Sequence, residues 1–345
     1  MPKSINTPRA YGDTLGKALF KKTPEDFIVN ETLVFEPEGE GEHVYLYIKK
    51  RNTNTQWLAA ELAKFANIKQ RDISYAGLKD RNAVTRQWFS LLLHKDKEPD
   101  WSEFKLEGID ILKATRHRSK LRPGMAKINQ FIITLHETDC DEAALKQRIE
   151  LINQFGVPNY FGEQRFGHDD NNLVQARLLF EGKIKVKQRN KKGLYLSAAR
   201  SDLFNSVLAE RVRQGNWNKA VTGDCMMLEG SHSFFGIEKV DNEIIKRVNE
   251  YDIHPTGPLW GCGEPLSTQD CLLLEDDILN EQQLFKRGLE MANMKMDRRS
   301  LGMKPVALEY EQESPHIIKL AFGLSAGQYA TTLLHELFDY HTGSI

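Results

Sequence analysis

An acidic side chain on a short turn is the part of this sequence best placed to do chemistry. The stretch 73–88 begins as a short apolar strand, breaks at Gly77, and resumes as a second apolar strand. Asp80 lies on the turn, between Lys79 and Arg81. Loops that interrupt a rigid sheet often carry function, because the scaffold fixes the side chain while the turn exposes it. The alternative is a solvated turn whose charges keep two strands soluble.

Two common catalytic motifs are missing from the sequence. It contains no Gly-x-x-x-x-Gly-Lys-Ser/Thr phosphate loop and no His-Glu-x-x-His metal motif. His335 is followed by Glu336, but the second histidine that a zinc protease requires is absent. The His-Asp-Asp group at 168–170 could contact a metal, although such a group is more often part of a loop. The glycine-spaced stretch 322–327 indicates a tight turn from a strand into a helix. We therefore expect no metal site.

The length and composition indicate a cytoplasmic protein of two domains. The chain has 345 residues, which exceeds what one core normally spans. Its four cysteines show no Cys-x-x-Cys spacing, which argues against a disulfide framework and a structural zinc site. No apolar run approaches the length of a membrane span, and the N-terminal residues lack the apolar core of a signal peptide. We expect no contact with a membrane.

Basic residues are concentrated in two segments of a chain whose net charge is only −1. The segments 111–136 and 182–201 contain many lysines and arginines and no acid. Such segments suggest a polyanion laid along one face, and solvated loops are the alternative. The candidates for contact with the backbone of that polyanion are Arg116, Arg118, Lys120, Arg122, Lys187 and Arg189.

The elements that must position these residues follow from hydrophobic periodicity. Strands are predicted at 27–31, 43–49, 88–93, 109–114, 131–135, 306–310 and 317–322. Helices are predicted from Asn54 or Thr55 to about 65, and at 142–156, 197–213, 238–248, 281–294 and about 326–338, the last capped by Ser325. Strands at both ends with helices between them indicate that a mostly helical middle is inserted into a sheet domain.

Several motifs spread along the chain resemble those of a known family. In chain order they are Lys21 with Pro24-Glu25-Asp26-Phe27, Tyr75-Ala76-Gly77-Leu78-Lys79-Asp80, Leu121-Arg122-Pro123-Gly124, Val157-Pro158-Asn159-Tyr160-Phe161-Gly162-Glu163-Gln164-Arg165-Phe166-Gly167 and Ala326-Gly327-Gln328-Tyr329. Together they resemble the TruD family of tRNA pseudouridine synthases over nearly the whole chain. Two positions depart from the family pattern, namely Tyr329 where phenylalanine is expected and Lys127 where a glycine is common.

The resemblance implies an α+β fold with a mixed, largely antiparallel sheet in the catalytic domain and an inserted, mostly helical α/β domain. The catalytic pseudouridine synthase domain would take 1–154 plus 304–345, and the inserted domain 155–303. The implied activity is that of a tRNA pseudouridine synthase, an isomerase that converts uridine 13 in the D arm of tRNA to pseudouridine without cofactor or metal. The partner is then tRNA, and we expect the chain to act as a monomer.

The implied reaction breaks the N-glycosidic bond, rotates the uracil and reattaches it through C5, so it needs a carboxylate nucleophile or base. The resemblance assigns this role to Asp80. The carboxylate would add to the uracil ring or assist departure at the sugar, and the sequence leaves both open. A cation within about 4–6 Å favours the ionised form of a carboxyl group. Lys21 is the candidate for this charge partner, with Lys79 and Arg81 as alternatives.

The resemblance also implies residues that contact the base. Phe27 and Tyr329 would lie at the uridine, and Phe131 would pack nearby. Asn129 could hydrogen-bond the uracil edge with both a donor and an acceptor. Aromatic stacking, worth about 1–3 kcal/mol per base, would offset the cost of taking the base out of its stack. For Phe27 and Phe131 the alternative is plain core packing, because each lies in an apolar run.

Two other functions are compatible with the residues. An RNA-binding module could hold a flipped uridine without converting it. A carboxylate-dependent hydrolase would need a second acid, such as Glu25 or Asp26, to face Asp80.

Overall fold

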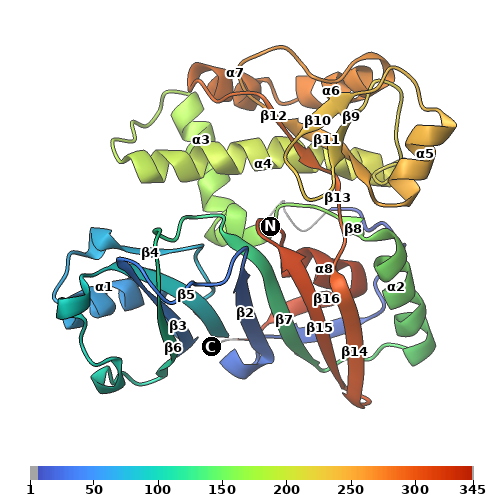
Figure 1. Cartoon of the computed structure of the whole chain (residues 1–345). Helices are drawn as coiled ribbons and strands as arrows, with labels where there is room; N and C mark the ends of the chain where they lie inside the picture. The colour runs from blue at the N-terminus through green and yellow to red at the C-terminus, as the bar shows by residue number, and fades with distance from the viewer. Residues whose placement is uncertain (1–6, 344–345) are drawn as a thin grey trace. The chain divides into compact units, whose positions relative to one another are not determined.

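The computed structural model describes residues 7–343, which divide into two compact units (Figure 1). Of the described residues, the insertion unit contains 7–13, Gln154–Lys304 and Tyr329–Glu336. The sheet unit contains Thr14–Asn153, Pro305–Gln328 and 337–343. The segments 7–13 and 329–336 thus group with the insertion unit by their contacts, although they fall within the ranges predicted for the catalytic domain, and those predicted domain bounds stay a prediction.

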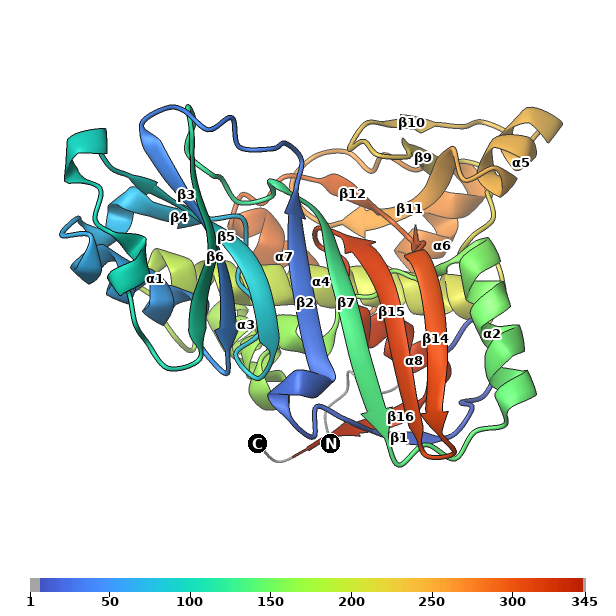
Figure 2. The ribbon, with the colours of Figure 1, turned by 60° about the horizontal axis from the view of Figure 1, so that its bottom comes forward.

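A ten-stranded sheet forms most of the sheet unit (Figure 2). Its strands are β1 Lys17–Phe20, β2 Phe27–Leu33, β3 His43–Arg51, β4 Ile73–Tyr75, β5 Val84–Leu92, β6 Ile109–His117, β7 Ala126–His136, β14 Val306–Ser314, β15 Ile317–Ser325 and β16 Asp339–Thr342. The central path runs β14-β15-β7-β2-β5-β3-β6, and along it only β2 and β5 are parallel. The short β4 pairs with β5, and β1 pairs with β7 and β16. The predicted α+β fold with a mixed, largely antiparallel sheet is confirmed.

The core of the sheet unit follows from the alternation in β3. Val44, Leu46 and Ile48 are fully buried, at the alternate positions that the sequence indicated. The helix α1 (Thr55–Phe65) packs its apolar residues into the same cluster. Asn54 caps α1 by accepting hydrogen bonds from the first N–H groups of the helix, as predicted. This packing joins α1 to β3 and to β5, the strand that follows the Asp80 turn.

The insertion unit is built around α4, a helix of 25 residues. Its elements are β8 Val157–Pro158, α3 Asn171–Phe180, α4 Arg189–Arg213, β9 Cys225–Leu228, β10 Phe234–Gly236, α5 Asn242–Asn249, β11 Ile253–Leu259, α6 Gln269–Asn280, α7 Gln283–Met291, β12 Asp297–Ser300, β13 Gly302–Met303 and most of α8 Ala330–Leu337. α4 packs against α3, α6, α7 and β11. Within the residues that the structure describes, no helix has the length and apolarity to cross a membrane.

The middle of the chain contains more strand than the sequence indicated. The predicted helices at 197–213, 238–248 and 281–294 correspond to α4, α5 and α7. The four-stranded sheet β10-β9-β11-β12 and the pair β8-β13 were not located in advance. These strands are short, and β11 contains two prolines and a glycine, so periodicity could not detect them.

Of two further helices, one agrees with the prediction and one begins later than predicted. The helix α2 (Glu142–Phe155) agrees with the predicted helix at 142–156. The last helix, however, begins at Ala330, and Ser325 is the final residue of β15 rather than a helix cap. The segment between them forms a turn in which Gly327 has a φ of +84°.

A tight turn at 221–224 holds a buried ion pair near the end of α4. The guanidinium of Arg211 donates to the Asp224 carboxylate at 2.9 and 3.0 Å, and both side chains are at most 1% exposed. Gly223 in this turn has a φ of +84°, and a Cβ there would lie 1.8 Å from the Thr268 carbonyl oxygen. The turn therefore requires glycine both for its backbone conformation and for space.

Gly223→Ala is expected to lower the free energy of unfolding by about 2–5 kcal/mol, because backbone strain and overpacking add. Gly215→Ala is the matched control, since Gly215 has a φ of +66° but no atom within 4 Å of the added Cβ. Only the backbone strain of about 1–2 kcal/mol then applies. Urea denaturation followed by circular dichroism measures both variants. Equal losses would show that the turn can move to accommodate a methyl group.

Candidate active site

Asp80 lies on the turn between β4 and β5, as the sequence predicted, and hydrogen bonds fix that turn. The N–H of Asn82 donates to Asp80 Oδ1 at 3.1 Å. The N–H of Lys79 donates to Thr55 Oγ1 at the start of α1, at 3.2 Å. β5 begins at Val84, earlier than the predicted strand at 88–93, so the turn is short. The Asp80 side chain is 18% exposed, which leaves the carboxylate reachable but largely shielded from water.

Lys21 forms an ion pair with Asp80 although the two residues are 59 positions apart in the chain. Lys21 directly follows β1 and has a φ of +57°, a left-handed conformation that is uncommon for a residue with a side chain. Such strained residues cluster at functional sites. The Lys21 side chain is only 10% exposed, and its ammonium lies 4.3 Å from the centroid of the Phe27 ring. The structure thus brings the carboxylate to the cation proposed as its partner, and their catalytic roles stay a prediction.

Lys79, one of the alternative cations, points to a different acid. Its ammonium pairs with Glu31 on β2, and the other carboxylate oxygen of Glu31 accepts a hydrogen bond from the N–H of Trp88 at 3.0 Å. Glu31 is 2% exposed. Arg81, the other alternative, has an exposed side chain. Lys79 therefore ties the Asp80 turn to β2.

Asn129 on β7 lies opposite Glu31 on β2 in the antiparallel register. Its Oδ1 is buried and has no hydrogen-bond partner among the residues that the structure describes. Leaving a buried acceptor unsatisfied costs about 1–3 kcal/mol. This oxygen is therefore suited to accept a hydrogen bond from a ligand.

Phe27 and Phe131 are packed in an aromatic row. Their ring centroids lie 5.9 Å apart in a stacked arrangement, and Phe131 stacks in turn on Phe322 at 5.4 Å. Both rings are buried. Core packing, which the sequence left as the alternative, thus describes their present contacts. A role of either ring at a base stays a prediction.

Tyr329 belongs to the insertion unit, and its hydroxyl is held there by an arginine. Arg165 donates to the Tyr329 hydroxyl from Nε at 3.1 Å and from Nη2 at 2.7 Å, and from Nη1 to Ser197 Oγ at 2.8 Å. The buried guanidinium of Arg299 lies 4.2 Å from the Phe161 ring centroid, next to this group. Burial lowers the pKa of Arg299 to about 10. The hydroxyl that distinguishes Tyr329 from phenylalanine thus has defined partners.

The candidates for contact with an RNA backbone fall into two groups. Arg116 is buried and donates to Glu98 at 2.5 and 2.9 Å, and to the carbonyls of Gly41 and Leu93. This arginine therefore holds loops of the sheet unit together, and we withdraw it from the candidates. The others have exposed side chains: Arg118, Lys120, Arg122, Lys187 and Arg189. Arg118 also contacts Glu38 and Glu40.

The acids that a hydrolase would need beside Asp80 have other partners. Glu25 pairs with Arg51 at 2.5 Å, and Asp26 pairs with His136 at 2.8 Å. In the part of the chain that the structure describes, no group of three or more histidine, cysteine or acidic residues is arranged to hold a metal ion.

Ser325 stands in a Gly-x-Ser-x-Gly sequence, which our sequence analysis treated only as a turn. This spacing formally fits the nucleophile elbow of hydrolases, which places the serine between a strand and a helix. Ser325 is exposed, and within the described residues no histidine or acid contacts its hydroxyl. The general base that such a serine requires is therefore missing.

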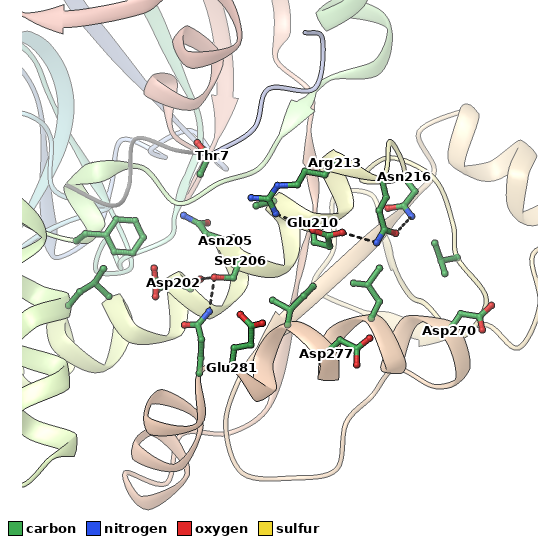
Figure 3. A pocket seen from close by; sticks show the side chains of 18 residues that line it. Thr7, Asp202, Asn205, Ser206, Glu210, Arg213, Asn216, Asp270, Asp277 and Glu281 are labelled. Atoms are coloured by element: carbon green, nitrogen blue, oxygen red, sulfur yellow. Dashed lines mark hydrogen bonds and ion pairs between the residues drawn. The ribbon is translucent and has the colours of Figure 1, made fainter. Parts of the chain in front are cut away.

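A cavity of about 770 Å³ lies in the insertion unit, between α4 and α6 (Figure 3). Gln282 donates to Ser206 at 2.8 Å on its wall. The charged residues that line it are five acids and one arginine: Asp202, Glu210, Asp270, Asp277, Glu281 and Arg213. None of the predicted site residues lines it, and carboxylate walls repel phosphate, so we do not assign RNA to it.

Comparison with known proteins decides the family. Residues 13–186 and 171–337 match the family model of tRNA pseudouridine synthase D (TruD). The chain is 45% identical to the tRNA pseudouridine synthase D of Methylococcus capsulatus over 341 residues, covering 98% of this chain and 96% of that protein. This chain belongs to the TruD family.

Other members agree with this assignment. The tRNA pseudouridine synthase D of Hydrogenovibrio crunogenus is 41% identical over 342 residues, covering 98% of this chain and 99% of that one. A crystal structure described as a putative tRNA pseudouridine synthase D from Methanosarcina mazei has the same fold, with a TM-score of 0.74 at 23% identity. It covers 98% of this chain and 97% of that one. The resemblance inferred from the motifs is confirmed.

Lys50 is a contact of the Asp80 turn that the sequence analysis missed. Its side chain lies inside the sheet unit, and its ammonium donates to the carbonyls of Thr53 at 2.6 Å and Asp80 at 2.9 Å. Burial lowers the pKa of Lys50 to about 8, and the Asp80 carboxylate opposes this shift. A signal was present, because Lys50 continues the alternate positions of Leu46 and Ile48 and so falls on the buried face of β3.

Glu31→Gln is expected to lower the free energy of unfolding by about 3–5 kcal/mol, because it leaves the Lys79 ammonium buried without a counter-charge. Glu61→Gln is the control, since Glu61 pairs with a Lys64 side chain that is 72% exposed, and a loss of at most about 1 kcal/mol applies there. Guanidinium denaturation measures both. Similar small losses of stability in the two variants would mean that the Lys79 side chain moves into solvent and that its ion pair with Glu31 does not anchor the turn.

Proposed function

We propose that this chain isomerises uridine 13 in the D arm of tRNA to pseudouridine. The C1′–N1 bond breaks, C1′ joins C5 of the rotated uracil, the C5 proton is lost and N1 takes up a proton. The reaction is redox-neutral, so the proposal requires no cofactor. The observation that supports it most directly is the shielded Asp80–Lys21 ion pair on a well-anchored turn, in a chain of the TruD family.

In the proposed mechanism Asp80 is the nucleophile and Lys21 is its charge partner. The ammonium keeps the carboxylate in place and balances its charge in a site that is shielded from water, where electrostatic interactions are stronger. Addition to the uracil ring and assistance at the sugar both use the same carboxylate. Its Oδ1 accepts a hydrogen bond from the Asn82 N–H and its Oδ2 accepts one from the Lys21 ammonium, so both oxygens have a fixed direction.

The uridine contacts are proposed as follows. The unsatisfied Oδ1 of Asn129 accepts a hydrogen bond from N3–H of uracil, and its amide donates to a uracil carbonyl. Phe27 and Tyr329 stack on the base, and Phe131 supports Phe27 from behind through the stacked contact. The tRNA backbone is contacted by the exposed cations Arg118, Lys120, Arg122, Lys187 and Arg189.

The proposal also concerns the domain organisation, oligomeric state and cellular location of the protein. A catalytic domain of 1–154 plus 304–345 and an inserted TruD domain of 155–303 would both contact tRNA. We propose that the protein acts as a monomer. All four cysteines are free, which is compatible with the reducing cytoplasm where tRNA is modified.

Incubation of the protein with unmodified tRNA transcripts, followed by chemical adduct formation and primer extension, tests the function. A new stop at position 13 is expected. Asp80→Asn is expected to lower the rate more than about 10³-fold while tRNA affinity stays nearly unchanged, because only the nucleophile is lost. Asp110→Asn is the control, since that aspartate is exposed and pairs with Lys49.

The other functions give different results. Release of free uracil would indicate a hydrolase. Tight tRNA binding by the unsubstituted protein with no modified base in any transcript would indicate an RNA-binding module.

Lys21 and Lys22 provide a matched pair for testing the charge partner. Lys21→Met is expected to lower the single-turnover rate roughly 10²-fold, because the Asp80 carboxylate loses its cation. Lys22 is the adjacent residue and is exposed, so Lys22→Met removes the same charge without touching Asp80. Equal rates for the two variants would exclude Lys21 as the charge partner.

A further inference from the structure

Lys50 occupies a position where a charged side chain is unfavourable. It lies on β3 with no exposed surface, on the same strand face as the fully buried Leu46 and Ile48. Its neighbours across the sheet are Thr85 on β5 and Ile109 on β6. Neither carries a charge. Burying an ammonium on the core-facing side of a strand is costly, so its retention in this place requires an explanation.

The hydrogen-bond partners of Lys50 are two main-chain carbonyls from different parts of the sheet unit. Its Nζ donates to the carbonyl of Thr53, just before α1, and to the carbonyl of Asp80 on the turn. Lys21 holds the same residue by its carboxylate, from the end of β1. Two lysines therefore hold Asp80: Lys50 contacts its main-chain carbonyl, and Lys21 contacts its carboxylate.

We propose that Lys50 is a positioning residue that fixes the main chain of Asp80, and thereby the direction in which its carboxylate points. This inference rests on the proposed role of Asp80 as nucleophile. With the carbonyl held from inside the sheet unit, rotation of the peptide at residue 80 is prevented. The side-chain ion pair with Lys21 acts on the carboxylate and does not contact the carbonyl, so a separate contact is needed to hold the peptide. A displacement of about 1 Å at a reacting group can cost about 10²-fold in rate.

The positive charge of Lys50 strengthens its hydrogen bonds to the two carbonyls. Two charged groups on the turn act on it, since the Asp80 carboxylate raises its pKa and the Lys79 ammonium lowers it. The Asp80 carboxylate also pairs with Lys21, and the Lys79 ammonium also pairs with Glu31 on β2. Burial is the largest effect and brings the pKa of Lys50 to about 8. Above that pH the neutral amine loses the charge-assisted hydrogen bonds and the turn loosens.

Lys50→Met tests the proposal, with Lys49→Met as the matched control. Lys49 is the adjacent residue on β3, and its partly exposed ammonium pairs with Asp110 at 3.1 Å. In single-turnover assays on a tRNA transcript, Lys50→Met is expected to lower the rate about 10- to 100-fold, with tRNA affinity changed less than twofold. Lys49→Met is expected to retain the rate of the unsubstituted protein.

Two further measurements separate positioning from a general structural role. The melting temperature of Lys50→Met at pH 7 is expected to fall by no more than a few degrees, because removing the cost of the buried charge offsets the two lost hydrogen bonds. The unsubstituted protein and Lys49→Met are expected to lose activity with a midpoint near pH 8, and Lys50→Met is expected to show no such midpoint.

The outcomes also separate this inference from the proposed function. If the unsubstituted protein forms no pseudouridine, the proposed function fails. If it is active and Lys50→Met matches Lys49→Met in rate, only the role of Lys50 is overturned. If Lys50→Met does not fold, the pH profile of the unsubstituted protein decides, and a rate that stays constant from pH 7 to 9 overturns the proposal.

Discussion

The ion pair between Lys21 and Asp80 is the interaction on which the rest of the proposed site depends. A carboxylate on a turn is useful only if its direction is fixed, and a turn has few neighbours to fix it. This chain meets that constraint with charges that come from other elements. Lys21 reaches the carboxylate from the end of β1, in a left-handed backbone conformation that costs energy and places its ammonium between Asp80 and the Phe27 ring.

The sheet order explains why so many charges can meet at one turn. The central path places β2 and β3 on either side of β5, the strand that leads away from the turn. Glu31 on β2 and Lys50 on β3 each occupy the buried face of their strand. Both would be destabilising as isolated charges, since a buried pair is only weak support for stability and an unpaired buried charge is worse. Their retention is consistent with a lower stability of the fold being tolerated because these residues make the turn rigid.

Sequence periodicity predicted most of the sheet unit, because its strands alternate clearly and α1 has a recognisable cap at Asn54. The turn at Asp80 was recognised from Gly77 and the flanking apolar runs. Lys50 and Glu31 were missed because a charge within an alternating strand is usually assigned to solvent, although their positions fall on the buried face. Arg116 was misjudged for the opposite reason, since local charge density does not reveal that Glu98 and two carbonyls enclose it. The strands of the insertion unit depend on contacts between distant segments, which periodicity cannot report.

Tyr329 shows how a departure from a family pattern can be accommodated. A phenol in place of a phenyl ring adds a polar group, which is costly when buried unless it is hydrogen-bonded. Arg165 removes that cost with two N–H donors and is itself tied to Ser197. A phenylalanine would be oriented by apolar packing, including that against Phe161, whereas the hydroxyl adds a charge-assisted hydrogen bond whose strength falls steeply with angle. The substitution therefore makes the direction of this ring more strictly defined within the insertion unit. If Tyr329 stacks on the uridine as proposed, that stricter direction favours a single orientation of the base.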